Sequence, residues 1–163
     1  MNFFEQLFQI LVLGIGATIV MDIWLFILMQ LNIPTLNFAL LGRWIGWIFK
    51  GKIRHHPISQ SPQIQHESLL GWCTHYSVGV LFAFIFILFM GETWLIQPEF
   101  YSAFAFGLIT VLVPFLIMQP ALGAGIAAAN TPQPWLNRLK SLINHGIFGC
   151  GLYLAAKFLK LFN

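Results

Sequence analysis

Four long apolar stretches constrain the fold of this chain more than any other feature of its sequence. They run from about residue 7 to 31, 69 to 90, 100 to 119 and 139 to 162. A helix needs about 20 apolar residues to cross the hydrocarbon core of a bilayer, and each stretch is long enough. Lipid offers the backbone no hydrogen-bond partners, so such a stretch takes the form of a helix. The sequence therefore predicts an all-α membrane protein, with four transmembrane helices bundled into one domain over residues 1–163.

The composition supports a surface that faces lipid. Of the 163 residues, 58% are hydrophobic and 8% are charged, whereas soluble domains carry about 25% charged residues. So few charged side chains cannot cover a water-soluble domain of this length. The formal net charge of +3 includes no long run of like charges, and it therefore does not indicate a nucleic-acid site. The expected partner is the lipid bilayer.

The segment after the first stretch predicts a further, interfacial amphipathic helix from about residue 36 to 50. Arg43, Gly46 and Lys50 share one side of a helical wheel. The other side carries Leu36, Leu40, Trp44, Trp47 and Ile48. Such a helix tends to lie in the membrane interface, with its tryptophans at the depth of the lipid headgroups.

A polar loop follows this helix and contains three histidines and a glutamate: His55, His56, His66 and Glu67. Their spacing fits no strong zinc signature. We expect these histidines to be solvated.

The distribution of Lys and Arg predicts the orientation of the chain. Six lie on one side, in the loop before the second stretch and in the loop that runs into the fourth, namely Arg43, Lys50, Lys52, Arg54, Arg138 and Lys140. The opposite side holds two, Lys157 and Lys160. The positive-inside rule then places the basic loops in the cytoplasm and both termini outside.

The second and fourth stretches share a pattern at an offset of seventy residues. Gly71, His75 and Gly79 match Ser141, His145 and Gly149, and each set lies on one helical face. The pattern is consistent with a parallel repeat of two helix pairs, as found in transporter folds. It is equally consistent with small residues lining the interior of a bundle.

Asp22 is the most informative single residue. It lies nine positions before Leu31, or roughly 14 Å along a helix with a rise of about 1.5 Å per residue. An ionisable group near mid-membrane costs about 2.5 to 3.5 kcal/mol on insertion scales. The sequence leaves two alternatives open, a functional group or a structural aspartate bonded to Thr18 or to a neighbouring helix.

A polar intramembrane cluster can form around Asp22. Its candidate members are Asp22, Thr18, His75, His145, Asn144 and Gln119. The histidines and the aspartate suit a proton relay or a metal site made by His75, His145 and Asp22. A haem held by the two histidines, with Gly79 and Gly149 leaving room for the ring, is a third possibility. Hydrogen-bonded packing residues are the alternative without chemistry, so the cofactor stays open. No nucleophile elbow or catalytic cysteine signature is present, so we assign no catalytic residues.

Five segments together resemble a bacterial membrane-protein family, domain of unknown function 2938. They are GIGATIVMD from Gly14, LNFALLGRWIG from Leu36, GWCTHYSVG from Gly71, PFLIMQPALGAGIAAANTPQPW from Pro114 and INHGIFGCGLYLAA from Ile143. The resemblance covers nearly the whole chain. It implies an integral protein of the bacterial plasma (inner) membrane, and it brings no known reaction. In that membrane, the outer side that the positive-inside rule predicts for both termini is the periplasm.

Three classes of function remain open from the sequence. The first is a transport or permeation module for a small solute or ion, lined by Asp22, His75 and His145. Four spans are few for a transporter, so this class implies a homo-oligomer. The second is a structural or assembly subunit of a membrane complex. The third is a haem- or metal-binding membrane protein.

Overall fold

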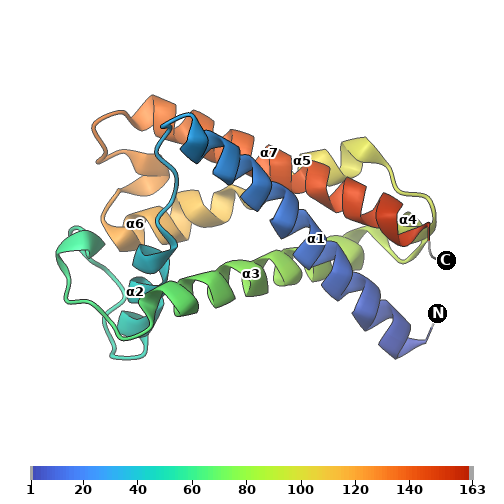
Figure 1. The fold of residues 1–163 in the computed structure, drawn as a ribbon, viewed down its shortest axis with the longest axis horizontal. Coiled ribbons are helices and arrows are strands. Elements are labelled where there is room, and N and C mark those ends of the chain that lie inside the picture. The colour runs from blue at the N-terminus through green and yellow to red at the C-terminus, as the bar shows by residue number, and fades with distance from the viewer. Residues whose placement is uncertain (1, 162–163) are drawn as a thin grey trace. The chain divides into compact units, whose positions relative to one another are not determined.

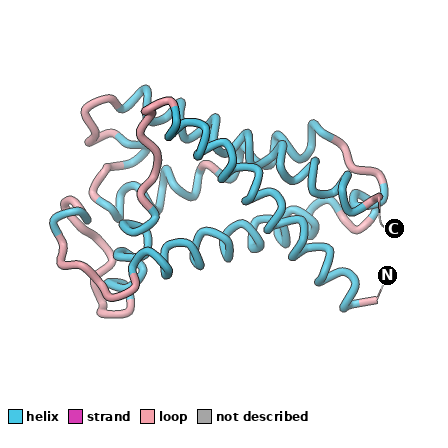
Figure 2. The backbone as a smooth tube through the Cα atoms, viewed as in Figure 1, coloured by secondary structure: helices cyan, strands magenta, loops and turns pink. Residues whose placement is uncertain are grey.

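The computed structural model describes residues 2–161 and shows a helical chain (Figure 1). Helices make up 76% of it, and the described residues contain no strand. Figure 2 shows the loops that join the helices. The predicted all-α class is confirmed.

Four helical spans within residues 2–161 are long and apolar enough to cross a membrane. They are α1 (Phe3–Gln30), α3 (Glu67–Met90), Phe100–Leu122 and α7 (Pro134–Leu159). The third span consists of α5 (Phe100–Thr110), the π-helical turn η2 (Pro114–Met118) and α6 (Gln119–Leu122). The prediction of four membrane-spanning helices is therefore confirmed.

The other elements are short. They are α2 (Phe38–Ile48), α4 (Thr93–Ile96), η1 (Ile58–Gln60) and η3 (Ile126–Ala128). The helix α2 falls inside the range predicted for the amphipathic helix. It begins after Asn37, whose side chain accepts a hydrogen bond from the backbone N–H of Ala39 and so caps the helix.

Local chemistry explains why two helices begin earlier than hydropathy suggests. The Asn2 side chain accepts from the backbone N–H of Glu5, and the Glu5 carboxylate accepts from the backbone N–H of Asn2. This capping box starts α1 at Phe3. The helix α7 starts at Pro134, where a proline suits a first turn whose N–H groups have no partner in the helix.

Pro114 changes the form of the third span without ending it. Because proline has no N–H, it cannot make the regular hydrogen bond to the preceding turn. The backbone widens into η2 at this point. The Phe115 N–H still donates to the Val111 carbonyl, and the span continues to Leu122.

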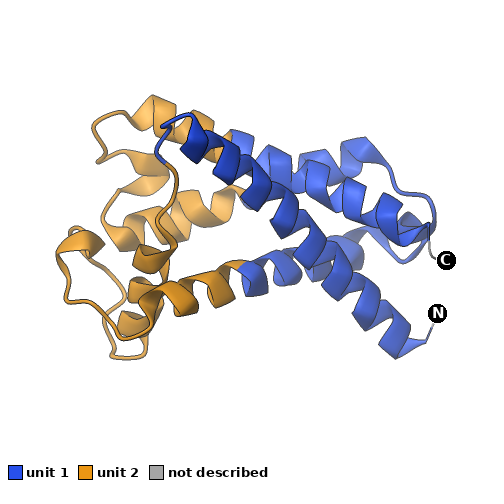
Figure 3. Cartoon of the chain, in the orientation of Figure 1, with its two compact units in different colours: residues 1–34, 76–110, 143–163 blue, residues 35–75, 111–142 orange. Residues whose placement is uncertain are grey.

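The chain divides into two compact units, coloured separately in Figure 3. Unit 1 comprises Met1–Pro34, Tyr76–Thr110 and Ile143–Asn163, and unit 2 comprises Thr35–His75 and Val111–Leu142. Unit 1 thus contains α1, most of α3, α5 and most of α7.

Small residues bring the helices of unit 1 together. A Cβ added at Gly14 would collide with the backbone of Val80, which places α1 against α3. A Cβ at Gly151 would lie 2.7 Å from the Ala17 carbonyl oxygen, which places α7 against α1. Gly107 and Gly149 bring α5 against α7 in the same way. Such contacts let backbones approach closely where lipid provides no hydrophobic drive between helices.

Unit 2 is built on α2 and the first turns of α3. A Cβ at Gly42 would collide with the Glu67 carbonyl oxygen, and one at Gly71 would collide with the Phe38 carbonyl oxygen. A small apolar core follows from this packing and contains Leu41, Trp44, Ile58 and Ala121. The loop after α2 is fixed to α6 because the His55 N–H donates to the Ala121 carbonyl.

The expectation that the loop histidines are solvated is wrong for one of them. The side chain of His55 is 1% exposed. Its Nδ1 lies 2.7 Å from the Ser61 hydroxyl, and its ring lies against Trp47. His56 and His66 are exposed, as expected. His55 is buried because the loop folds back and packs against α2.

Candidate intramembrane polar site

Asp22 is bonded to a neighbouring helix in unit 1. The Tyr76 hydroxyl of α3 donates to Asp22 Oδ2 of α1 at 2.8 Å. Both side chains are half-buried. Asp22 lies eight residues before Gln30, the last residue of α1, which is about 12 Å at 1.5 Å per residue. Asp22 thus has a hydrogen-bond donor on a neighbouring helix inside an apolar span, where an unpaired polar group is costly.

Thr18 and Asp22 lie on one side of α1 but bond differently. The Thr18 side chain is fully buried, and its hydroxyl donates to the Gly14 carbonyl at 2.8 Å. Gly79 of α3 lies directly against the Thr18 hydroxyl. The bond from Tyr76 of α3 is thus the contact with a neighbouring helix that was one of the structural alternatives for Asp22.

His145 is bonded to Thr110 across the contact between α7 and α5. The Thr110 hydroxyl donates to the Gly107 carbonyl at 2.6 Å, and His145 Nδ1 lies 2.8 Å from the Thr110 hydroxyl oxygen. A hydroxyl has one proton to donate, so His145 Nδ1 is the donor in this pair. Neutral His145 therefore carries its proton on Nδ1, and Nε2 is the basic nitrogen of the ring.

Asn144 connects α7 to α1 beside this pair. The Trp24 indole N–H donates to Asn144 Oδ1 at 2.9 Å. Asn144 and His145 are consecutive, so α7 meets α1 and α5 with adjacent polar side chains. Unit 1 thus contains polar contacts between α1 and α3, α1 and α7, and α5 and α7, all within membrane-spanning helices.

His75 and Gln119, the other two predicted cluster members, belong to unit 2. The His75 ring lies 4.5 Å from the Phe38 ring and 6.0 Å from the Trp72 ring, measured between centroids. Gln119 donates to the Ser141 hydroxyl at 3.3 Å. The predicted cluster members are therefore divided between the two units.

The metal and haem hypotheses gain no support from these contacts. Within residues 2–161, no group of three or more His, Cys, Asp or Glu side chains is placed to hold a metal ion. A Cβ at Gly149 would lie 2.7 Å from the Ala103 carbonyl oxygen, and one at Gly79 would collide with Thr18. The spaces expected to hold a haem ring beside these glycines are filled by α5 and α1.

Arg43 and Glu67 form a buried ion pair in unit 2 that the sequence did not reveal. The guanidinium donates twice to the carboxylate, at 2.8 Å in each bond. It also donates to the carbonyls of Ser59 and Ser61. Arg43 is 6% exposed although it lies on the polar side of α2, because the loop from residue 49 to 66 covers that side.

Sequence reasoning also missed Tyr76 and Trp24. Tyr76 lies among the polar residues Thr74, His75 and Ser77 of α3, and its phenol hydroxyl is the signal that could have indicated a partner for Asp22. Trp24 lies two residues after Asp22 and could be read as a packing residue. Neither the helical period nor hydropathy identifies the partner of a polar side chain.

Four apolar spans with polar side chains between them indicate a multi-pass membrane protein. The chain belongs to the family DUF2938, described as "Protein of unknown function", whose model matches residues 11–159. The resemblance read from the sequence is thereby confirmed. A search of curated proteins and a search of solved structures each found no match.

Proposed function

We propose that this protein is a transport or permeation module for an ion or small solute in the bacterial inner membrane, and that a proton moves through its helices. The observation that carries the proposal is the hydrogen bond from Tyr76 to Asp22 between two membrane spans. Ionisable residues within such spans are rare, and they usually mark ion paths or proton relays.

The surrounding side chains support a path for protons. Asp22, Tyr76 and His145 all carry exchangeable protons, and His145 offers a basic Nε2 when neutral. A histidine has an ordinary pKa near neutral pH, which suits reversible protonation. Thr110 fixes the orientation of the imidazole through Nδ1. Four spans enclose little space, so the working form under this proposal is a homo-oligomer.

The proposed orientation places the basic loops in the cytoplasm and both termini in the periplasm. The helix α2 then lies in the cytoplasmic membrane interface. Fusion of alkaline phosphatase, which is active in the periplasm, and of a fluorescent protein that matures in the cytoplasm tests this orientation. An active phosphatase after residue 163 is the expected result, and fluorescence there would refute it.

Proton flux into liposomes tests the proposed function. Purified protein is reconstituted with a pH-sensitive dye inside, and a potassium diffusion potential drives protons inward. Wild-type protein should acidify the interior faster than empty liposomes do. Asp22→Asn keeps an oxygen that can accept from Tyr76 but removes ionisation, so it should abolish the flux while the melting temperature stays unchanged.

Glu5→Gln is the matched control, because Glu5 is an exposed carboxylate in the first turn of the same helix. This variant should keep the flux. A wild-type protein that moves no protons above the empty-liposome rate, or an Asp22→Asn variant with full flux, would refute the proposal in this form.

A structural or assembly role is the second candidate, and the packing of unit 1 favours it specifically. The close glycine contacts and the hydrogen bonds between helices both serve to lock neighbouring spans. This role predicts that Asp22→Asn lowers both the yield and the melting temperature. The same set of variants therefore distinguishes the two candidates.

A further inference from the structure

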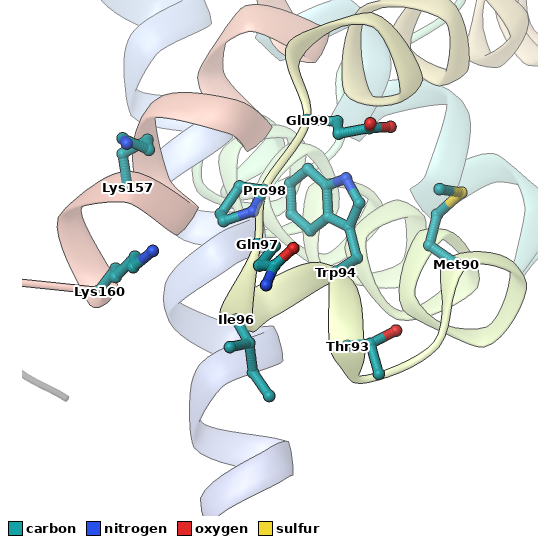
Figure 4. Close-up of a pocket in the computed structure, with 9 residues that line it drawn as sticks. All are labelled: Met90, Thr93, Trp94, Ile96, Gln97, Pro98, Glu99, Lys157 and Lys160. Carbon is teal, nitrogen blue, oxygen red and sulfur yellow. The ribbon is translucent and has the colours of Figure 1, made fainter.

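One end of unit 1 contains an open cavity of about 800 Å³. Its walls come from the end of α3, the connection that carries α4, and the end of α7. Figure 4 shows Lys157 and Lys160 on one side, Glu99 on the other and Trp94 between them. The remaining lining residues are Met90, Thr93, Ile96, Gln97 and Pro98.

The floor of this cavity is fixed by hydrogen bonds and ring packing. Trp94 is 4% exposed, and its indole N–H donates to the Ser102 hydroxyl at 2.8 Å. Its ring packs edge-on against Phe86, with centroids 4.6 Å apart. The Ser102 hydroxyl donates onward to the Glu99 carbonyl. The connection between α3 and α5 is thus held in place around the cavity.

The cavity lies where three membrane spans end. The helix α3 ends at Met90, α5 begins at Phe100 and α7 ends at Leu159. Two large apolar side chains close in sequence to lining residues are exposed: Phe89, next to Met90, at 80%, and Tyr101, two residues after Glu99, at 85%. A position with apolar surface on one side and charged groups on the other is typical of the lipid headgroup region.

The charged groups of the cavity favour an anionic ligand. Lys157 lies in the last turn of α7, and Lys160 follows three residues later on the same face. Both lysines and Glu99 are exposed, and across residues 2–161 none of the three forms an ion pair. The two ammonium groups outnumber the one carboxylate, so the cavity attracts a ligand with one net negative charge.

We propose that this cavity binds the phosphate headgroup of an anionic phospholipid, with Lys157 and Lys160 on the phosphate and the acyl chains along the apolar surface beside Phe89 and Tyr101. Glu99, Gln97 and Thr93 then lie beside the polar alcohol of the headgroup. A headgroup with hydroxyl groups, such as that of phosphatidylglycerol, can donate to the Glu99 carboxylate. This inference is independent of the proposed proton path.

Native mass spectrometry of the detergent-purified full chain tests the proposal. Phosphatidylglycerol is titrated into the protein, with phosphatidylcholine as the lipid without net charge. Each lysine near an anionic headgroup contributes enough for about a fivefold change in affinity, so Lys157→Gln with Lys160→Gln should weaken phosphatidylglycerol binding roughly 25-fold. Lys157→Arg with Lys160→Arg retains the charges and should bind as the wild type does.

A second double variant controls for the loss of net charge. Lys50→Gln with Lys52→Gln removes the same two charges from unit 2, where both lysines lie over the Trp47 ring. It should leave the tightest phosphatidylglycerol binding unchanged. Equal weakening in the two double variants, or wild-type binding by the variant altered at Lys157 and Lys160, would overturn the proposal.

Inorganic phosphate distinguishes a lipid site from a site for a soluble anion. The lipid headgroup is held together with its acyl chains, so millimolar phosphate should not displace phosphatidylglycerol. Displacement at that concentration would overturn the lipid assignment. All the variants should melt at the wild-type temperature, because the altered side chains are exposed.

Discussion

Gly107 offers the sharpest test of how unit 1 is held together. It lies where α5 crosses α7, and a Cβ added there would sit 2.5 Å from the His145 carbonyl oxygen and 2.6 Å from Gly149 Cα. Both neighbours are backbone atoms, which cannot rotate away as a side chain can. Gly107→Ala therefore forces the two helices apart.

The magnitude follows from these distances. Ordinary van der Waals contact begins at 3.4 Å, so the two helices must separate by about 0.9 Å at this point. A gap of about 0.5–1 Å forfeits a quarter to a half of the dispersion energy between facing atoms. Overpacking of this kind costs about 1–3 kcal/mol. The better helix propensity of alanine returns about 0.5–1 kcal/mol. We expect a net loss of about 1–2 kcal/mol, or a melting temperature lower by about 3–6 °C.

Gly146→Ala on α7 is the matched control. Its Cβ would lie 3.1 Å from Cε2 of the Phe104 ring, a side-chain atom that can move by a few tenths of an ångström. We expect its stability to stay within about 0.5 kcal/mol of the wild type. Unfolding in mixed detergent and SDS micelles, followed by tryptophan fluorescence, measures both variants. The argument is refuted if Gly107→Ala is as stable as Gly146→Ala.

Two further predictions concern unit 2. Glu67→Gln leaves the buried Arg43 guanidinium without its carboxylate and should cost about 3 kcal/mol in the same unfolding assay, whereas the exposed Lys50→Gln should change stability by less than about 0.5 kcal/mol. Burial lowers the pKa of His55 below its ordinary value of 6.5, so below about that pH the unfolded chain binds a proton that the folded chain does not. Stability is then retained above pH 6.5 and lost as the pH falls through the lowered pKa. The melting temperature of the wild type should drop between pH 7.5 and pH 5. This drop should be smaller in His55→Asn and should remain in His66→Asn, which changes an exposed histidine.

Hydropathy and helical period predicted much of the fold. The four spans follow from the length of the apolar stretches, because a bilayer selects helices of that length. The family was recognised from segments that lie along all four spans. The small residues Gly79 and Gly149 were read as candidates for a bundle interior, and in unit 1 they make close contacts between helices.

The candidate site could be predicted only in part. Asp22 and His145 stood out because polar side chains are costly in lipid, and that cost depends on residue type alone. Their partners, Tyr76 and Thr110, come from other helices. His75 and Gln119 were grouped with them and belong to unit 2, where the His75 ring lies near Phe38 and Gln119 donates to Ser141. A helical wheel identifies the face of a residue but not the helix that covers that face.

The sequence by itself therefore determined the membrane class, the number of spans and the residues that cannot face lipid without cost. Each of these depends on transfer free energies that add along the chain, so they can be read from composition and period. Only the tertiary structure decided that Asp22 meets Tyr76, that Arg43 meets Glu67 and that His55 is buried. These contacts depend on how segments distant in sequence pack against each other. No local sequence pattern encodes the distances between such segments.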